Sequence, residues 1–371
     1  MKKGWQTKPI GKVATIKPPK SEARERVAAD ALVSFLSMED LGIAVKFPEP
    51  KKARKLSDVV GSYTYFAEDD VLLAKITPCF ENGKLGIAKG LKNGIGFGSS
   101  EFIVLRPYSS ITSEWLFYFL SRDNFRSEGA QRMGGAVGQQ RVPKEFVESC
   151  HIPIPPLSEQ QRIVRILDDA FDGLASATAN AEQNLRNARA LFESHLQSVF
   201  IRHGDSPLVP IGDIAEVFDG PHATPKTVDA GPVFLGISAL QDGKINLGET
   251  RHVTPDDFRK WTRRVKPQTD DVVFSYETRL GQAAIIPEGL ECCLGRRMGL
   301  VRVNRKRVDP RFFVYQYISP PFRKFLDSKT VRGATVDRIA LKEFPSFPIS
   351  LPSLAEQEGM TRRLDKLRVE T

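Results

Sequence analysis

Residues 152–202 begin IPIPPLSEQQRIVRILDDAF and end LFESHLQSVFIR, and this stretch predicts one long amphipathic helix behind a proline-rich run. Pro155 and Pro156 cannot propagate a helix, so the helix should start after them, with Ser158 as N-cap and Gln161 completing a capping box. Gly204 is the expected stop. Apolar or small residues recur at alternating steps of three and four, the spacing of a coiled-coil seam. They are Ile163, Leu167, Ala170, Leu174, Ala177, Ala181, Leu185, Ala188, Phe192, Leu196 and Val199.

The predicted helix is longer than a compact domain requires, because about 45 residues at 1.5 Å each give a rod of roughly 65 Å. Its seam should therefore pack against another helix. A weaker copy of its beginning, ISLPSLAEQEGMTRRLD, occupies residues 349–365, where Ser353 and Glu356 offer a capping box and Met360 and Leu364 continue a seam. That copy supplies at most about 17 residues, or roughly 25 Å. Much of the first helix is thus predicted to lack a partner from its own chain.

These helices belong to a longer internal repeat. Five segments recur in the same order at an almost constant offset of about 200 residues, which chance does not readily produce. The matching pairs are 9–14 with 210–215, 68–73 with 269–274, 114–126 with 311–323, 141–142 with 338–339, and 152–157 with 349–354. A chain of 371 residues also suits two domains, each able to bury a core. The sequence predicts two similar blocks, 1–151 and 205–348, followed by the helical segments 152–204 and 349–371.

Each block is predicted to be mixed α/β. Short β-branched or apolar runs predict strands at Asp70–Ile76, Glu101–Leu105, Val272–Tyr276 and Gly299–Val303. The aromatic segments Ser113–Leu120 and Pro310–Ile318 have helix length and should pack against a sheet rather than stack on bases. A helix is also expected at Glu22–Met38 and a loop at Phe47–Arg54. The predicted fold class is α/β (α+β), with two similar globular domains separated by long coiled-coil helices in a pseudo-twofold repeat.

The composition is that of a globular protein, with 41% hydrophobic and 27% charged residues. Lysine and arginine outnumber aspartate and glutamate by 54 to 45, a net charge of +9 that suits a polyanion such as nucleic acid but is also found in basic enzymes. No apolar run approaches the roughly 18–20 residues that span a bilayer, and the N-terminus lacks the apolar segment of a signal peptide. The four cysteines form no CxxC pair, so free thiols in a reducing cytoplasm are expected.

Sequence motifs assign no chemistry to this chain. Ser319–Phe322, SPPF, is similar to the catalytic loop of DNA amino-methyltransferases, but a glycine-rich cofactor loop is missing, so a helix-terminating turn is favoured. No phosphate-binding loop, nucleophile elbow or paired metal-ligand spacing occurs, and the five histidines are scattered. We therefore assign no catalytic and no metal-binding residue.

Two glycine-containing loops carry the candidate binding residues: RMGGAVGQQRV at 132–142 and VRGATVDRI at 331–339. Glycine lets the backbone approach a ligand closely, and Gln, Arg and Thr side chains can bond base edges or phosphates. For any one candidate, a solvated surface role is an equal alternative. The candidate DNA-binding residues in these loops and at strand ends are Lys75, Thr77, Arg132, Gly134, Gly135, Gln139, Gln140, Arg141, Tyr276, Arg279, Arg296, Arg297, Arg332, Gly333, Thr335 and Arg338.

Taken together, the repeat and its helices resemble the specificity subunit of type I restriction–modification enzymes, over essentially the whole chain. The runs IPIPPLSEQQRI and LPSLAEQ are the most specific part of the resemblance, and the GGAVGQQRV-like loops agree with it. It implies that 1–151 and 205–348 are target recognition domains, each recognising one half of a split site in double-stranded DNA. The helices would form an antiparallel spacer that fixes the gap between the two halves.

The resemblance also implies the partners and assigns every cofactor to them. Two modification (methyltransferase) subunits would dock on the spacer and bring S-adenosylmethionine. Restriction subunits would add translocation and cleavage, with ATP and Mg²⁺. No cofactor is expected on this chain, and no membrane.

The short second helix departs from the family pattern. Three interpretations are open: a shortened form of a longer chain, a natural truncation, or self-association through the unpaired seam. Two other functions also remain open, a stand-alone DNA-modifying enzyme with fused recognition domains and a coiled-coil scaffold that binds only protein.

Overall fold

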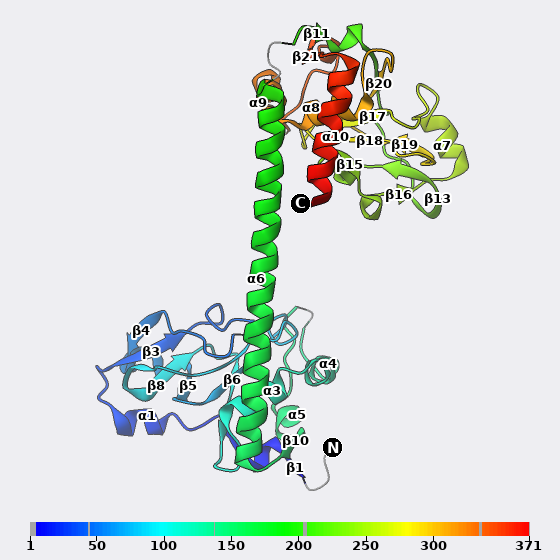
Figure 1. Cartoon of the computed structure of the whole chain (residues 1–371). Helices are drawn as coiled ribbons and strands as arrows, with labels where there is room; N and C mark the ends of the chain where they lie inside the picture. The colour runs from blue at the N-terminus through cyan, green and yellow to red at the C-terminus, as the bar shows by residue number, and fades with distance from the viewer. Residues whose placement is uncertain (1–4, 44, 137, 203–205, 334–335, 371) are drawn as a thin grey trace. The chain divides into compact units, whose positions relative to one another are not determined.

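The computed structural model describes residues 5–43, 45–136, 138–202, 206–333 and 336–370. The chain divides into two compact units, Met1–Thr178 and Ala179–Thr371. Each is a mixed α/β unit built from sheets and helices (Figure 1). The predicted fold class, two similar α/β domains with a long helix, is confirmed. Gly204, the predicted helix stop, lies outside the described residues.

Unit 1 contains two sheets and a strand pair. One sheet has the order β2-β9-β6-β7 and is antiparallel; the other has the order β4-β3-β8-β5, with β3 and β8 parallel. The pair β1–β10 joins the first described strand to the strand that leads into the long helix. The strands are β1 (Gln6–Pro9), β2 (Ala14–Ile16), β3 (Leu32–Leu36), β4 (Lys52–Lys55), β5 (Thr64–Ala67), β6 (Val71–Ala74), β7 (Leu85–Ile87), β8 (Ile95–Gly98), β9 (Phe102–Pro107) and β10 (His151–Ile154).

The helices of unit 1 contribute aromatic residues to one of its core clusters. Helix α3 has the bounds predicted from the sequence, and Thr112 caps it by accepting a hydrogen bond from Trp115 N at 3.1 Å. Its aromatic side chains are buried beside strands β6 and β9, so the prediction that they are core residues is confirmed. The helices are α1 (Ser21–Arg26), α2 (Leu56–Val59), α3 (Ser113–Leu120), α4 (Asp123–Gln131), α5 (Lys144–Ser149) and the first turns of α6 (Leu157–Arg202).

The antiparallel sheet β2-β9-β6-β7 is the main sheet of unit 1, and unit 2 repeats it in the order β12-β20-β17-β18. Its second sheet, β16-β13-β19, again contains one parallel pair, β13 with β19. The strands are β11 (Leu208–Pro210), β12 (Ala215–Asp219), β13 (Val228–Leu235), β14 (Leu240–Gln241), β15 (Lys244–Ile245), β16 (Arg251–His252), β17 (Val272–Ser275), β18 (Ala283–Ile285), β19 (Cys292–Leu294), β20 (Met298–Val303) and β21 (Pro348–Ser350). The helices are α7 (Pro255–Trp261), α8 (Pro310–Ile318), α9 (Pro320–Lys329), α10 (Leu354–Glu370) and the last turns of α6.

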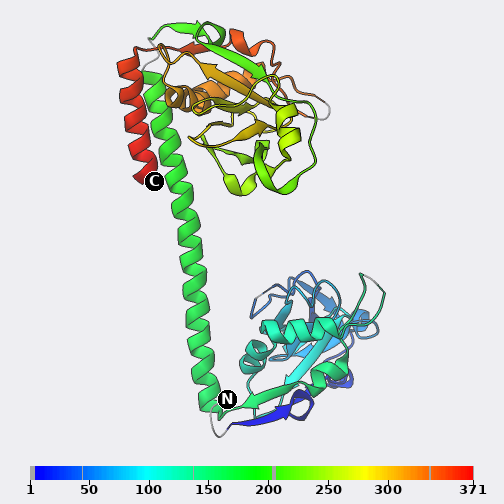
Figure 2. The same cartoon turned by 90° about the vertical axis from the view of Figure 1, so that its right-hand side faces the viewer.

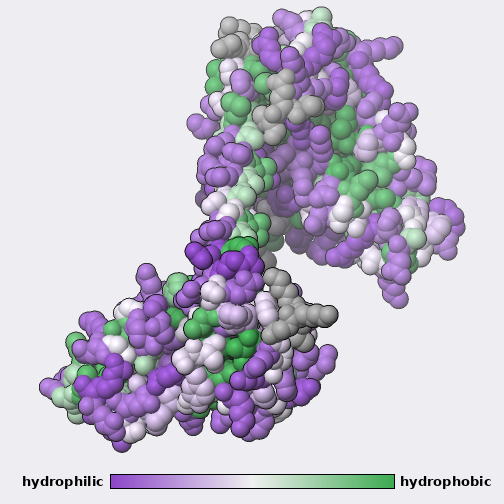
Figure 3. Space-filling view, turned by 60° about the horizontal axis from the view of Figure 1, so that its bottom comes forward, coloured by the Kyte–Doolittle hydropathy of each residue, from purple (hydrophilic) through white to green (hydrophobic). Residues whose placement is uncertain are grey.

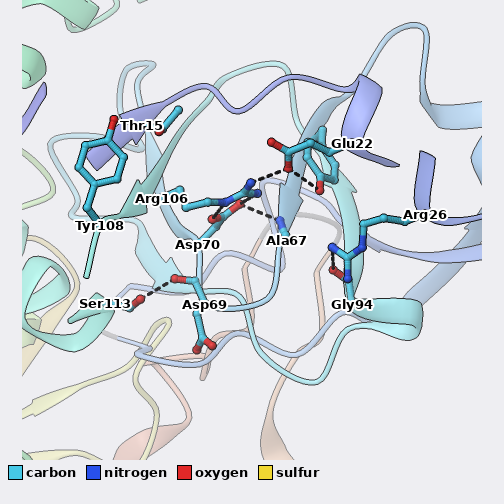
Figure 4. Close-up of polar contacts among 11 residues, drawn as sticks. Thr15, Glu22, Arg26, Ala67, Asp69, Asp70, Gly94, Arg106, Tyr108 and Ser113 are labelled. Carbon is cyan, nitrogen blue, oxygen red and sulfur yellow. Dashed lines mark hydrogen bonds and ion pairs between the residues drawn. The ribbon is translucent and has the colours of Figure 1, made fainter. Parts of the chain in front are cut away.

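A buried ion pair accounts for one of the repeated sequence segments. In unit 1, Asp70 is fully buried and accepts hydrogen bonds from Arg106 Nε at 2.7 Å, from its Nη2 at 2.8 Å and from Ala67 N at 2.7 Å (Figure 4). Asp271 and Arg302 form the same pair in unit 2, at 2.9 and 2.7 Å. The hydrogen bonds to Asp70 raise the pKa of Arg106, whereas burial raises the pKa of Asp70 against the lowering effect of Arg106. The duplication is therefore visible in side-chain chemistry as well as in sheet order.

Helices α6 and α10 each begin with a buried glutamine at the equivalent position. Gln160 donates to Pro155 O and Ser110 O, each at 2.9 Å, and accepts from Thr112 N at 3.0 Å. Gln357 makes the equivalent bonds in unit 2, to Pro352 O, Arg307 O and Asp309 N, at 2.8, 3.0 and 2.9 Å. Each amide thus anchors a helix start to the loop before α3 or α8.

The predicted caps had different outcomes. Helix α6 starts at Leu157 with Pro156 O accepting its first hydrogen bonds, so Ser158 is not the N-cap and that prediction is wrong. The proline carbonyl is free to begin the helix although its ring nitrogen cannot donate. For α10, Ser353 Oγ accepts from Glu356 N at 3.4 Å, and Ser353 N donates to the Glu356 carboxylate at 2.9 Å. That capping box is confirmed.

Helix α6 is buried at its ends and exposed in between. Val164 packs in unit 1, and Leu196, Val199 and Phe200 pack in unit 2. Every residue from Asp169 to Asn187 is exposed, including the seam residues Leu174 and Leu185. In unit 2, α10 lies beside the last turns of α6 (Figure 2), and Met360 and Leu364 share its core. The exposed middle of α6 carries green and white residues alongside hydrophilic ones (Figure 3). The prediction of an unpaired seam holds for the described residues.

The region before β4 was predicted incorrectly. Glu22–Met38 was expected to be one helix, but it forms the short helix α1 and the strand β3. Strand β3 pairs with both β4 and β8 and buries Val33, Phe35 and Leu36. Pairing with two distant strands therefore overrides local helix propensity there. The expected loop at Phe47–Arg54 also ends early, because β4 begins at Lys52.

The four cysteines are free thiols, as predicted. Cys292 and Cys293 are buried in β19, whereas Cys79 and Cys150 are partly exposed. Among the described residues, no helix combines the length and the apolar character that a membrane span needs.

Candidate functional site

In unit 1 the glycine-containing loop is closed at its base and attached to the end of β6. Gly134 and Arg141 exchange backbone hydrogen bonds of 3.1 and 2.9 Å. Val142 N then donates to Lys75 O, and Thr77 N donates to Gln140 O, each at 2.9 Å. These bonds hold both ends of the loop together and attach it to the chain that follows β6.

Unit 2 repeats this arrangement bond for bond. Val331 and Arg338 exchange backbone hydrogen bonds of 2.8 and 3.2 Å, Ile339 N donates to Tyr276 O at 2.9 Å, and Thr278 N donates to Asp337 O at 3.2 Å. The two predicted loops therefore occupy equivalent places on equivalent sheets, with different side chains. Thr335 lies outside the described residues.

The glycines of the first loop have backbone conformations that need them. Gly135 and Gly138 have φ angles of +123° and +80°, in the region that disfavours side chains. A Cβ on Gly135 would also stand 3.0 Å from Gln139 O. Gly134 and Gly333 have ordinary φ angles. Of the glycines predicted as candidate binding residues, only Gly135 therefore has a backbone conformation that requires glycine.

Arg141 is held by a carboxylate that the sequence analysis did not single out. Its Nε and Nη2 donate to the two oxygens of Glu101 at 2.9 Å each, and its Nη1 donates to Gln139 O at 2.9 Å. Lys75 Nζ lies 3.9 Å from the same carboxylate. The hydrogen bond from Arg141 lowers the pKa of Glu101, which therefore stays ionised near neutral pH. Arg141 thus clamps its own loop to the sheet.

Unit 2 places its charges differently. Glu277 forms its ion pair with Arg297 and not with the loop residue Arg338. Tyr276 is buried, and its hydroxyl donates to Asp219 at 3.0 Å. Arg279 Nη1 donates to two backbone carbonyls, Ile237 O at 3.2 Å and Ser238 O at 3.0 Å. In this state Tyr276, Arg279 and Arg297 are engaged within the protein.

The remaining candidates lie in or near the loops. Thr77 donates to Glu81 at 3.0 Å, and the guanidinium of Arg132 lies over the Phe146 ring. Gln140 is half-buried at the base of its loop. Arg132 and Arg141 are exposed but make the contacts described above, and the other exposed candidate side chains are those of Gln139, Arg296, Arg332 and Arg338.

The structure brings further basic residues to the first loop. Lys17, Lys20 and Lys144 line a cavity together with Lys75 and Arg141. Lys17 and Lys20 lie more than a hundred positions before the loop, and no local sequence pattern links them to it. Glu101 and these lysines could be found only from the folded chain.

The SPPF segment is a helix–helix turn, as predicted. Ser319 ends α8 and caps α9, since its Oγ accepts from Phe322 N at 3.4 Å and donates to Gln316 O at 2.6 Å. Both Ser319 and Phe322 are buried. Within the described residues, no group of three or more His, Cys, Asp or Glu side chains is placed to hold a metal ion.

Comparison with known proteins gives a consistent family. A family model described as the type I restriction modification DNA specificity domain matches residues 2–185 and 208–370. The chain is 39% identical over 162 residues to the type I restriction enzyme EcoAI specificity subunit of Escherichia coli, covering 43% of this chain and 27% of that protein. It is 25% identical over 389 residues to the MjaVIII specificity subunit of Methanocaldococcus jannaschii, covering 98% and 86% of the two chains.

Two solved structures share the fold. One comes from work on complex assembly and conformational transition of the type I R-M system, with a TM-score of 0.70, 19% identity and coverage of 99% of this chain and 91% of that chain. The other is the HsdS subunit from Thermoanaerobacter tengcongensis, with a TM-score of 0.62, 17% identity and coverage of 100% and 90%. The family match covers both sequence repeats, and the two folded units correspond to them. The chain therefore belongs to the family of type I restriction–modification DNA specificity domains.

Proposed function

We propose that this chain is the DNA-recognition subunit of a type I restriction–modification complex, in which each unit recognises one half of a bipartite site. The observation that carries the proposal is the repeated loop. Equivalent hydrogen bonds, Gly134 with Arg141 and Val331 with Arg338, close the two loops beside equivalent strands, while the loop sequences differ. Two loops with the same backbone attachment and different side chains suit two half-sites of different sequence.

The chemistry of the loops fits duplex DNA. Gln139 and Arg338 are exposed, and such side chains form bidentate hydrogen bonds with adenine and guanine edges in the major groove. The net charge of +9 favours a polyanion and adds a sequence-independent attraction. Arg141, held by Glu101, would position its loop rather than read a base.

Helix α6 is proposed to set the gap between the half-sites and to dock the partners. Its exposed stretch from Asp169 to Asn187 carries an apolar seam suited to other helices. The partners we propose are two methyltransferase subunits that bring S-adenosylmethionine, and restriction subunits that use ATP and Mg²⁺. No step of that chemistry is assigned to residues of this chain.

The test compares Arg338→Ala with Arg141→Ala in the complex reconstituted with methyltransferase subunits. Arg338→Ala should weaken binding to a cognate duplex by about 5- to 150-fold, equivalent to about 1–3 kcal/mol, and relax specificity in one half-site only. Arg141→Ala should weaken the other half-site through loss of loop order. Lys12→Ala, an exposed basic residue of unit 1 outside the loops and outside α6, is the control and should bind normally.

Normal binding of cognate DNA by both loop variants would exclude the proposed interface. Binding of S-adenosylmethionine by the isolated chain would instead favour the alternative of a stand-alone modifying enzyme. Methylome sequencing of cells that carry the intact system identifies the two half-sites needed for these duplexes.

A further inference from the structure

A cavity of about 450 Å³ opens in unit 1 beside the first loop. It lies where the two sheets meet, and it is lined by the ends of β2, β6 and β9, by β5 and by the chain that follows the loop. Its basic lining residues are Lys17, Lys20, Lys75, Arg141 and Lys144. No carboxylate belongs to the described lining.

The positive charge is only partly offset from outside the cavity. Glu101 is shared by Arg141 and Lys75, at 2.9 and 3.9 Å, and Glu148 pairs with Lys144 at 2.7 Å. Two carboxylates therefore face five cations, and the remaining charge favours binding of an anion.

Lys17 and Lys20 carry the uncompensated charge. Among the described residues Lys17 has no ion-pair partner, while Lys20 Nζ donates to Val60 O and Gly61 O at 3.0 Å each. Burial lowers the pKa of Lys20, and the nearby positive charges of Lys17 and Arg24 lower it further. A bound anion would relieve this repulsion.

At the equivalent place in unit 2, the described residues differ from those that line this cavity. Ile16 pairs with Leu105 in unit 1, and Val217 pairs with Val301 in unit 2, so Ile16 and Val217 occupy equivalent positions. The next residue is Lys17 in unit 1 and Phe218 in unit 2. Tyr276 replaces Lys75, and its buried hydroxyl bonds to Asp219. Lys17 and Lys75 are thus specific to the cavity of unit 1, while unit 2 has a separate cavity of about 270 Å³ beside Asp219, whose lining includes Lys260, Arg263 and Arg264.

We propose that this cavity binds a phosphate group, and that the group is a backbone phosphate of duplex DNA next to the half-site recognised by unit 1. The assignment to DNA rests on the proposed function. Lysine and arginine side chains are the usual partners of phosphate oxygens, and the hydroxyls of Ser62 and Ser100 in the lining can donate as well. Because phosphate contacts carry no base information, the cavity adds affinity and register for one half of the site.

The first experiment needs no DNA. Sodium pyrophosphate is titrated calorimetrically into the full chain, the variant Lys17→Gln/Lys75→Gln, and the matched control Lys12→Gln/Lys55→Gln, whose lysines are exposed in the same unit away from the cavity. Wild type and control should bind pyrophosphate equally, and the cavity variant at least tenfold more weakly. Glu101→Gln removes the competing carboxylate and should strengthen binding several-fold.

The second experiment measures duplex binding by the reconstituted complex between 50 and 200 mM salt. Loss of one phosphate contact makes the negative slope of log K against log salt shallower by about 0.9. Over this fourfold increase in salt, the affinity of wild type should therefore fall by a factor about 3.5 times larger than that of the cavity variant. Its preference for each half-site should stay the same. The lysine control changes the net charge equally and should keep a steeper slope than the cavity variant.

Three results would overturn the proposal in different ways. Equal pyrophosphate binding by all variants would show that the cavity is not a phosphate site. A cavity-dependent pyrophosphate affinity with an unchanged duplex slope would show that it binds a free phosphate compound rather than DNA. A complex that binds no duplex at all would refute the proposed function and the DNA assignment, while the pyrophosphate titration would still report on the cavity.

Discussion

At the residue scale, two buried carboxylates define the repeated core. Asp70 and Asp271 are each the second residue of an Asp-Asp pair, and each accepts hydrogen bonds from Nε and Nη2 of an arginine on the neighbouring strand. A backbone N–H completes both sites, from Ala67 and Gln268 at 2.7 and 2.8 Å. Such a pair is costly to break, because removal of one partner leaves a charge without compensation.

Asp70→Asn should destabilise unit 1. The amide keeps the shape but removes the charge that Arg106 requires, so the free energy of unfolding should fall by about 1.5–3 kcal/mol. Urea denaturation measures this change. Asp69→Asn is the control, because Asp69 is exposed, and should change stability by less than about 0.5 kcal/mol. Equal effects of the two substitutions would mean that the pair contributes no specific stability.

Cys292 and Cys293 should resist alkylation in the folded chain. Burial raises the pKa of both thiols to about 12, and the thiolate is the reactive form. At pH 8 the thiolate fraction should therefore be about a thousandfold smaller than for an ordinary cysteine. Because the raised values belong to the folded state, these groups stabilise the fold below about pH 8.5 and lose that contribution as the pH rises toward 12.

Mass spectrometry after iodoacetamide treatment at pH 8 measures this directly. Modification of Cys292 and Cys293 should require urea, whereas the partly exposed Cys79 serves as the native-state reference. Rapid labelling of the β19 cysteines without denaturant would contradict their burial.

At the scale of elements, a surface that is covered by a helix in unit 2 is open in unit 1. In unit 2, Phe192 and Phe200 of α6 lie against Tyr315 and Phe312 of α8, with ring centroids 6.2 and 5.6 Å apart. The matching surface of unit 1 borders a cavity of about 600 Å³. Its lining residues are Trp115, Tyr118, Phe119, Ser121, Arg122, Asp123, Pro153, Ile163, Leu167 and Phe171. By analogy with unit 2, a further apolar helix fits beside the start of α6.

The exposed seam of α6 should therefore bind another helix, from a second copy of the chain or from a methyltransferase subunit. Leu174→Glu/Leu185→Glu should abolish that association, because burial of two carboxylates in an apolar seam is unfavourable. Light scattering at several concentrations, with and without methyltransferase subunits, gives the masses. Ala179→Glu/Ala190→Glu adds the same charge on the opposite face and should assemble normally.

A strict monomer without added partner would exclude self-association. If the leucine variant also bound methyltransferase subunits as tightly as wild type, the seam would have no role in docking.

At the scale of the whole molecule, one continuous helix of 46 residues joins two units that each carry a loop of the same construction. The units are related by duplication, whereas their loop side chains and the basic cavity of unit 1 differ. The recognition of two different half-sites would follow from this combination of shared frame and divergent surface.

Insertion of one heptad into the exposed part of α6 should widen the gap between the half-sites. Seven residues add roughly 10.5 Å of helix while keeping the seam on nearly the same face, and this length corresponds to about three base pairs at 3.4 Å each. Methylome sequencing should show unchanged half-sites with a longer gap. An unchanged gap would mean that α6 does not set the spacing.

Replacement of residues 1–150 by the corresponding block of another family member should change one half-site and leave the other. The same sequencing method tests this, with the wild-type chain as reference. Altered sequences in both halves would contradict independent recognition by the two units.

Sequence patterns alone were enough to predict the duplication, the main strands, the aromatic helices α3 and α8, and the long helix with its unpaired seam. These features depend on local periodicity and turn chemistry, which a single stretch of chain contains. Other features became apparent only in the folded chain: the strand β3, the attachment of the loops to β6 and β17, the ion pair of Glu101 with Arg141, the burial of Tyr276 and the basic cavity around Lys17. Each of these depends on residues far apart in the chain, whose contacts exist only once the sheets have formed.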